Sequence, residues 1–196
     1  MSIKEEKADL RRRVWDKMEG LSPQYIENSD RAIEKRLLSS EEFLEADGIF
    51  TYNSMGREVS TAGIIRAARE LGKKVALPIS LPGGKMFFRY ASSGDRMRAG
   101  KYGIMEPDGD GETACPTKKS LIIVPALAFS RDLYRLGRGG GYYDRFLAQN
   151  DGIAVGLCRA KLLLDEVPID SFDIPVSAVI WEEGTIRKRT SEEALL

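Results

Sequence analysis

The residues best suited to chemistry lie in one basic, glycine-rich stretch, RLGRGGGYYD, at residues 135–144. A continuous apolar run at 121–124, typical of a buried parallel strand, precedes it, and an apolar helix pattern at 142–147 closes it. A strand, a glycine loop and a helix in this order direct backbone N–H groups and a positive helix end towards an anion. Arg135 and Arg138 add positive charge. The pattern therefore predicts a phosphate site.

The glycine loop is not diagnostic by itself. It has neither the GxxxxGK[ST] pattern of a P-loop nor the spacing of the dinucleotide-binding fingerprint. The run Gly139 to Gly141 would also suit a tight turn that needs positive φ angles and binds nothing. Both interpretations stay open on these residues alone.

Length and composition limit the class of protein. We expect 196 residues to form one domain, residues 1–196, with a full core. Thirty basic and thirty acidic residues cancel, so we expect no nucleic-acid or membrane partner and only a local anion site. The charged N-terminus does not resemble a signal peptide. Cys115 and Cys158 suggest a reduced cytoplasmic protein, with neither a disulfide framework nor a zinc site.

The chain contains no histidine. This excludes Ser-His-Asp and Cys-His catalysis and every histidine-ligated metal site. A bound metal would be a hard cation on oxygen ligands, such as magnesium. General-base chemistry would fall to a carboxylate, a tyrosine or the substrate itself.

The elements that must position the loop alternate between helix and strand. This order predicts a three-layer α/β fold with a mainly parallel sheet of about five or six strands. We expect helices at 3–19, from 23 to about 46 with an interruption near Ser39, from a cap at Ser60 or Thr61 to 71, and at 142–147. We expect strands at 48–53, 74–79, 85–90, 121–124, 153–157 and 178–181, and then a charged tail that frays.

Three further candidates each have a structural alternative. Lys7 and Arg11 are four residues apart on one helix face, which also suits a solvated basic face. Glu58 follows a strand at the sheet edge where ligands gather, but it also suits an exposed loop carboxylate or a helix cap. Asp144 follows the glycine loop beside the expected phosphate, but it would also complement the helix dipole.

RLGRGGGYYDR, preceded by VPALAF, closely resembles the signature of the 5-formyltetrahydrofolate cyclo-ligase family, also called methenyltetrahydrofolate synthetases. Weaker matches follow the family's order along nearly the whole chain. They are Lys7-x-x-x-Arg11, SMGREVST at 54–61, GKKVALP at 72–78, YGIMEP at 102–107, and Val167-Pro168 with Asp173-x-Pro175.

The resemblance implies ATP- and Mg2+-dependent closure of 5-formyltetrahydrofolate to 5,10-methenyltetrahydrofolate, with ADP and phosphate released. It also implies a fold similar to the sugar-phosphate isomerase and CoA-transferase group, and we expect a monomer or weak dimer. Asn53, Met55, Glu58 and Tyr142 would bind folate, Asp144 and Asp173 magnesium, and Arg135 and Arg138 would stabilise charge during the reaction. ATP would bind at Lys7, Arg11, Arg135, Leu136, Gly137, Arg138, Gly139, Gly140, Gly141, Tyr142 and Tyr143.

The sequence departs from the family pattern at several positions. Many members have aspartate at the position of Ser130, glycine at Leu133, histidine at Phe172 and glutamine near Leu162. An aromatic residue is common at the position of Arg138, although other members also have arginine there. Two other functions therefore remain as alternatives. One is a folate-binding relative without catalysis, and the other is a sugar-phosphate-binding module of similar fold.

Overall fold

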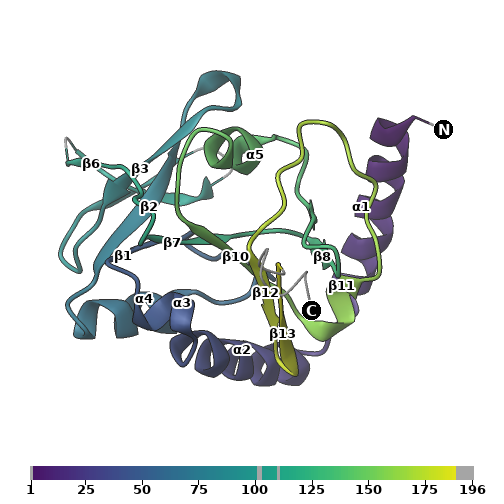
Figure 1. The fold of residues 1–196 in the computed structure, drawn as a ribbon, viewed down its shortest axis with the longest axis horizontal. Helices are drawn as coiled ribbons and strands as arrows, with labels where there is room; N and C mark the ends of the chain where they lie inside the picture. The colour runs from purple at the N-terminus through teal and green to yellow at the C-terminus, as the bar shows by residue number, and fades with distance from the viewer. Residues whose placement is uncertain (1, 101–102, 110, 189–196) are drawn as a thin grey trace, which may run out of the picture.

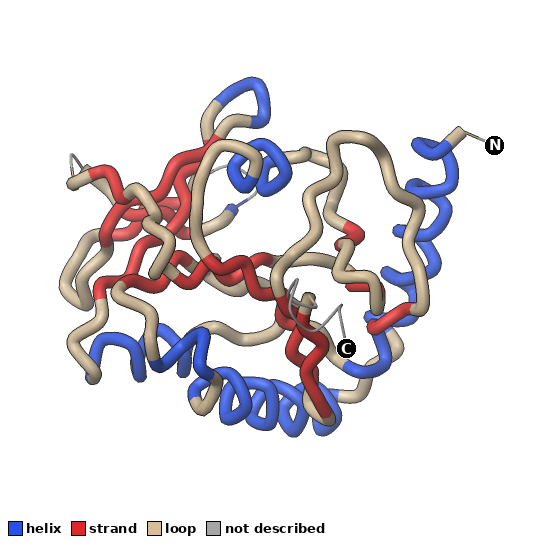
Figure 2. Tube along the Cα trace, in the orientation of Figure 1, coloured by secondary structure: helices blue, strands red, loops and turns tan. Residues whose placement is uncertain are grey.

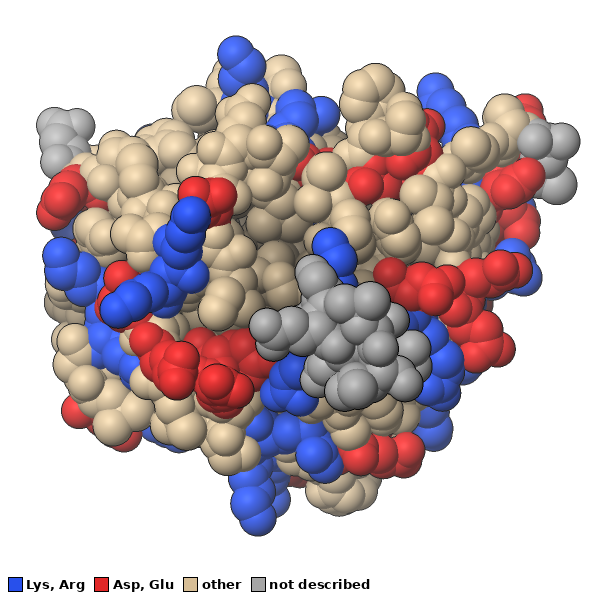
Figure 3. All heavy atoms as spheres, viewed as in Figure 1, with Lys and Arg blue, Asp and Glu red and all other residues tan. Residues whose placement is uncertain are grey.

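The computed structural model describes residues 2–100, 103–109 and 111–188. Tyr102 of the YGIMEP motif lies outside the described residues, as does the part of the expected frayed tail from residue 189 onwards. Lysine and arginine side chains intermingle with aspartate and glutamate side chains on the face drawn in Figure 3. This distribution accompanies the net charge of zero.

An eight-stranded sheet forms the centre of the molecule (Figures 1 and 2). Its parallel strands lie in the order β12 (Ala178–Trp181), β10 (Ile153–Leu157), β7 (Leu121–Val124), β1 (Gly48–Phe50) and β2 (Lys74–Ser80). Three antiparallel strands complete the sheet: β13 (Gly184–Arg187) beside β12, β3 (Met86–Tyr90) beside β2, and β6 (Thr113–Ala114) beside β3. In the register of the central strands, Ile49 lies between Val75 and Leu121.

Helices cover both faces of this sheet (Figure 1). One face carries α2 (Pro23–Leu38), α3 (Glu41–Leu44) and α4 (Ala62–Glu70), and the other carries α5 (Tyr142–Leu147) and α1 (Ile3–Glu19). Successive residues of β7 alternate between the two cores: Leu121 and Ile123 join the first, while Ile122 and Val124 join the second. Because both faces are buried, β7 needs no polar residue.

Two small sheets lie outside the main one. The first has the order β11 (Leu163–Leu164), β8 (Ala128–Ser130), β9 (Arg135–Leu136), and the second pairs β4 (Met97–Ala99) with β5 (Met105–Pro107). Short 3-10 turns, η1 (Pro82–Gly84) and η3 (Ala160–Leu162), lie in two connections. Val14 and Met18 of α1 share a core cluster with Ala128 and Leu136 of the first small sheet, so α1 stands beside the glycine loop that continues from β9.

The structure confirms the α/β class and most expected elements. Helices α1 and α5 have the expected bounds, and α2 ends at Leu38. The interruption has a local cause, because the Ser40 hydroxyl accepts a hydrogen bond from the Phe43 N–H and begins α3. Among the described residues, no helix has both the length and the apolar character needed to cross a membrane.

Other expectations were wrong. The main sheet has eight strands rather than five or six, because strands of two to four residues such as β6 and β13 are too short to show a period. Strand β13 also occupies residues expected in the frayed tail. Strand β1 ends at Phe50 rather than residue 53, and the first two residues of the expected glycine loop pair with β8 as β9. Thr61 precedes α4 without capping it, because its hydroxyl accepts from the Ser54 N–H at 3.3 Å and donates to the Tyr52 carbonyl at 2.7 Å.

The turn between β8 and β9 contains the one non-glycine residue with positive φ among the described residues. Leu133 has φ 68° and is buried in the second core. The turn is closed by the Ser130 N–H, which donates to the Tyr134 carbonyl at 2.8 Å. Leucine strains the backbone there, but its side chain fills the core.

We expect Leu133→Gly to lower the free energy of unfolding by about 2 kcal/mol, because losing a buried leucine outweighs about 1 kcal/mol of relieved backbone strain. Urea unfolding followed by circular dichroism measures the change. A glycine variant more stable than the parent would contradict this balance and show that strain dominates at Leu133.

Candidate functional site

Residues predicted to bind phosphate, magnesium and folate meet where the parallel strands end. The segment after β1 carries Glu58, the segment after β9 carries Arg138, and α1 carries Lys7 and Arg11. Asp173 reaches the same place from the segment before β12. Ligands gather at this edge in open parallel sheets.

Three ion pairs connect these residues. Lys7 pairs with Asp173. The Arg135 guanidinium lies 2.5 Å from Asp144 Oδ1, and the Arg138 guanidinium lies 3.0 Å from Glu58 Oε1. Each pair joins a cation predicted to bind phosphate to a carboxylate predicted to bind magnesium or folate. Each of these six charges therefore has an opposite partner, whereas Arg11 donates to the Gly137 carbonyl.

The glycine loop is held open by its contacts. Gly139 and Gly141 have φ angles of 94° and 63°, which side chains rarely allow. Arg11 Nε donates to the Gly137 carbonyl at 2.8 Å, and Arg145 donates to the carbonyls of Gly84 and Gly140. Within the described part of the chain, no group accepts a hydrogen bond from the backbone N–H groups of residues 138–141. Free amides around left-handed residues form a concave site for an anion.

The loop after β1 turns back on itself and carries the predicted folate residues. The Met55 N–H donates to Glu58 Oε2 at 2.9 Å, so one carboxylate oxygen orients the turn while the other meets Arg138. Asn53 Nδ2 donates to the Met105 carbonyl at 3.4 Å. The Tyr52 hydroxyl donates to the Val59 carbonyl at 2.9 Å and closes the base of the loop.

Tyr143 places a buried hydroxyl next to these charges. Its oxygen has no hydrogen-bond partner among the described residues. Burial raises the pKa of Tyr143, the negative charge of Glu58 raises it further, and Arg135 opposes the shift. A neutral, unpaired donor that feels the charges of both Glu58 and Arg135 is a group that a bound ligand can satisfy.

The sequence model of the 5-formyltetrahydrofolate cyclo-ligase family matches residues 3–182. The chain belongs to this family.

Relatives support the assignment over most of the chain. A probable 5-formyltetrahydrofolate cyclo-ligase of Schizosaccharomyces pombe is 30% identical, covering 95% of this chain and 99% of the relative. The 5-formyltetrahydrofolate cyclo-ligase of Escherichia coli K12 is 26% identical, covering 86% and 99%. The solved structure of 5,10-methenyltetrahydrofolate synthetase from Aquifex aeolicus is 30% identical with a TM-score of 0.83, covering 94% of each chain. This cyclo-ligase family member is therefore an enzyme of the ligase class.

Asp144 and Asp173 converge in this cyclo-ligase family member. The Ile174 N–H, next to Asp173, donates to Asp144 Oδ1 at 3.3 Å. The described residues contain no cluster of three or more acidic, histidine or cysteine side chains able to hold a metal. Two carboxylates fit magnesium nonetheless, because this ion completes its shell with water and phosphate oxygens.

Two positions that depart from the family pattern lie beside the site without entering its ion pairs. The Phe172 side chain is 81% exposed, although Asp173 follows it directly. Ser130 is buried and exchanges hydrogen bonds with the backbone of Tyr134 in the β8–β9 turn.

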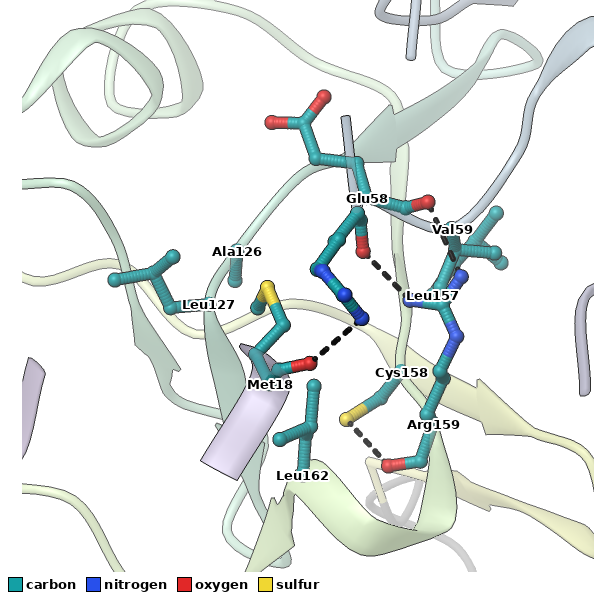
Figure 4. A pocket seen from close by; sticks show the side chains of 10 residues that line it. Met18, Glu58, Val59, Ala126, Leu127, Leu157, Cys158, Arg159 and Leu162 are labelled. Atoms are coloured by element: carbon teal, nitrogen blue, oxygen red, sulfur yellow. Dashed lines mark hydrogen bonds between the residues drawn. The ribbon is translucent and has the colours of Figure 1, made fainter. Parts of the chain in front are cut away.

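A small enclosed space lies behind the Glu58 loop (Figure 4). Its lining includes Met18, Leu127 and Cys158, and it has room for about one water molecule. The Glu58 carboxylate points away from this space in Figure 4.

Sequence reasoning missed two residues here. Trp15 is 43% exposed, and the Arg138 guanidinium lies 5.8 Å from the centre of its ring. Its spacing of four residues from Arg11 was the available signal. Arg159 lies two residues beyond the end of β10, at the edge where ligands gather, but it was not singled out.

The Arg135–Asp144 pair leads to an asymmetric prediction. Asp144→Asn leaves the Arg135 side chain, which is only 5% exposed, without its charged partner, so we expect a loss of about 2 kcal/mol in the free energy of unfolding. Arg135→Met leaves Asp144, which is 20% exposed and keeps the Ile174 N–H, so we expect a loss of about 1 kcal/mol.

Urea unfolding of both variants measures the difference. Asp165→Asn, in the exposed Arg131–Asp165 pair, is the control and should cost less than about 0.5 kcal/mol. Equal losses for Asp144→Asn and Arg135→Met would show that burial does not decide the cost of breaking the pair.

Proposed function

We propose that this cyclo-ligase family member converts 5-formyltetrahydrofolate to 5,10-methenyltetrahydrofolate, consuming ATP and releasing ADP and phosphate. The 3.0 Å contact between Arg138 and Glu58 is the observation that carries the proposal. It brings the glycine loop, where the triphosphate would bind, against the loop that would hold folate. A reaction between the two substrates needs this adjacency.

The chemistry suits a site without histidine. An N-formyl group is a weak electrophile, and its oxygen leaves poorly. Transfer of the γ-phosphoryl group to the formyl oxygen forms an O–P bond, breaks the bond to ADP and turns the oxygen into part of a leaving group. The substrate's N10 then attacks the activated carbon, loses its proton, and phosphate departs. The nucleophile belongs to the substrate, so the protein contributes positioning and charge stabilisation.

The nucleotide would exchange partners with the existing ion pairs. Lys7, Arg11, Arg135 and Arg138 would bind phosphate oxygens together with the free amides of the glycine loop. Arg135 and Arg138 would stabilise charge on the transferring group. Asp144 and Asp173, freed from their cations, would hold Mg2+, which when bound would neutralise triphosphate charge. The carboxylates thus keep the cations in place before ATP arrives.

Folate would bind along the outer side of the loop after β1. Asn53 and Glu58 offer polar groups, and Met55 offers an adaptable apolar surface. Tyr142 would lie near the pterin, and the Tyr143 hydroxyl would find its partner in a bound substrate. We further infer one domain over residues 1–196, a monomer or weak dimer, and a cytoplasmic location.

The decisive experiment follows methenyltetrahydrofolate absorbance after mixing the purified protein with 5-formyltetrahydrofolate, MgCl2 and ATP. We expect the signal to appear only with ATP. Arg138→Met should reduce kcat by about 100-fold, because Arg138 is 58% exposed and its loss removes charge stabilisation without unfolding the protein. Arg187→Met, in β13, removes a 52% exposed side chain that pairs with Glu42 of α3 and should leave kcat unchanged.

Other outcomes would reject catalysis by this chain. Tight 5-formyltetrahydrofolate binding in calorimetry, without ATP turnover, would indicate a non-catalytic folate-binding relative. Binding of simple sugar phosphates, without folate or ATP binding, would indicate a sugar-phosphate module. Folded protein that gives neither turnover nor folate binding would refute the proposal outright.

A second prediction concerns the unpaired hydroxyl of Tyr143. We expect Tyr143→Phe to keep or slightly raise the free energy of unfolding, because the described residues offer the hydroxyl no hydrogen bond to lose. The same variant should lower kcat/KM about tenfold, the worth of one hydrogen bond to substrate. Thermal melts and the absorbance assay measure the two effects. A clear loss of stability with unchanged kcat/KM would show that the hydroxyl serves folding and not substrate.

A further inference from the structure

Arg159 is a buried arginine to which neither the family signature nor the proposed mechanism gives a role. It follows β10, and only 1% of its side chain is exposed. Its guanidinium donates to Ser29 Oγ at 3.1 Å and lies 2.5 Å from Asp30 Oδ1; both residues belong to α2. Helix α2 therefore anchors the guanidinium.

The remaining hydrogen bonds of the Arg159 guanidinium go to the loop after β1. Its Nη1 donates to the Arg57 carbonyl at 2.8 Å, and its Nη2 donates to the Glu58 carbonyl at 3.1 Å. Figure 4 shows Arg159 meeting the Glu58 backbone from behind, while the Glu58 carboxylate points the opposite way. Arginine thus fixes two successive carbonyls directly beneath a predicted substrate-binding side chain.

The neighbouring arginine secures the other side of this loop. Arg57 Nη1 donates to the carbonyls of Met18 at 3.2 Å and Leu21 at 2.9 Å, at the end of α1. The Glu58 backbone is therefore fixed from α1 through Arg57 and from α2 through Arg159. The planar guanidinium can satisfy a carboxylate and two carbonyls at once, which a lysine ammonium with its compact geometry cannot reproduce.

Stability alone does not explain a buried arginine here. Burial raises the pKa of Asp30 although the Arg159 charge opposes the shift, so desolvation outweighs the attraction between the two. Replacing such a pair by well-packed apolar side chains is often neutral or stabilising. A demand for a fixed backbone accounts better for the arrangement.

We propose that Arg159 is a positioning residue that sets the Glu58 carboxylate against the folate substrate. The inference rests on the proposed function, because it assumes that Glu58 contacts folate. Arg159 itself lies behind the loop and acts through the backbone of Arg57 and Glu58.

The test compares Arg159→Lys with the parent enzyme in steady-state assays that vary each substrate separately. Lysine keeps the positive charge near Asp30 but lacks the two guanidinium nitrogens that donate to the Arg57 and Glu58 carbonyls. We expect the KM for 5-formyltetrahydrofolate to rise about tenfold, as for other supporting residues, while the KM for ATP stays within about twofold. Arg159→Met should show a larger rise in the folate KM if it folds. An equal rise in both KM values, or no rise, would overturn the inference.

A double-mutant cycle with Glu58→Gln separates positioning from general stability. If Arg159 acts through Glu58, Arg159→Lys should add less than about twofold to the folate KM in the Glu58→Gln background. A full tenfold addition would overturn the inference. Arg69→Met is the matched control, because Arg69 also donates to a carbonyl, that of Ala91 at 2.9 Å, but near the opposite end of β2. It should change the melting temperature without changing the folate KM.

Failure of the proposed function gives a different result. A parent protein without turnover refutes the proposed activity, and the same cycle is then read from calorimetric affinity for 5-formyltetrahydrofolate. If Arg159→Lys weakens 5-formyltetrahydrofolate binding in the parent but has no such effect in the Glu58→Gln variant, the result supports positioning even without catalysis. Unchanged binding in Arg159→Lys overturns it.

Discussion

Pairing of opposite charges at the carboxyl edge of the sheet is the constraint on which the rest of this site depends. Lys7, Arg135 and Arg138 would repel one another, and so would the three carboxylates that face them, if either set stood alone. Interleaving the two sets lets one small region hold both in place. In the proposed mechanism, bound phosphate and Mg2+ would take the place of these partners, so the paired side chains would already be positioned for charged ligands.

The fold provides this arrangement through its layers. A parallel sheet buried on both faces brings the ends of β1, β7 and β10 to one edge, where loops can carry polar groups without disturbing either core. The small sheet of β8, β9 and β11 then turns the chain so that the glycine loop faces α1. Arg57 and Arg159 hold the Glu58 loop against helices α1 and α2. Three of the six paired charges lie on helices or a strand (Lys7, Arg135 and Asp144), and the other three lie on loops (Glu58, Arg138 and Asp173).

Local pattern predicted the long elements well and the short ones poorly. Helix α1 and strand β7 follow from apolar spacing over a few turns or one uninterrupted run. Strand β13 was expected to fray, because its four residues, Gly184–Arg187, are too few to show a period and gain their stability from pairing with β12. The pattern predicted a helix cap at Ser60 or Thr61, but the Thr61 hydroxyl accepts from the Ser54 N–H of the preceding loop instead of from the helix.

The sequence by itself determined the α/β class, the positions of the main helices and strands, the absence of histidine chemistry and the family resemblance, because each is written in neighbouring residues or in composition. Only the tertiary structure decided that Lys7 meets Asp173, that Arg138 meets Glu58, and that Arg159 lies beneath that glutamate. These partners are 166, 80 and 101 residues apart. Which of them meet depends on strand order and on the packing of α1 and α2, and no local spacing encodes that choice.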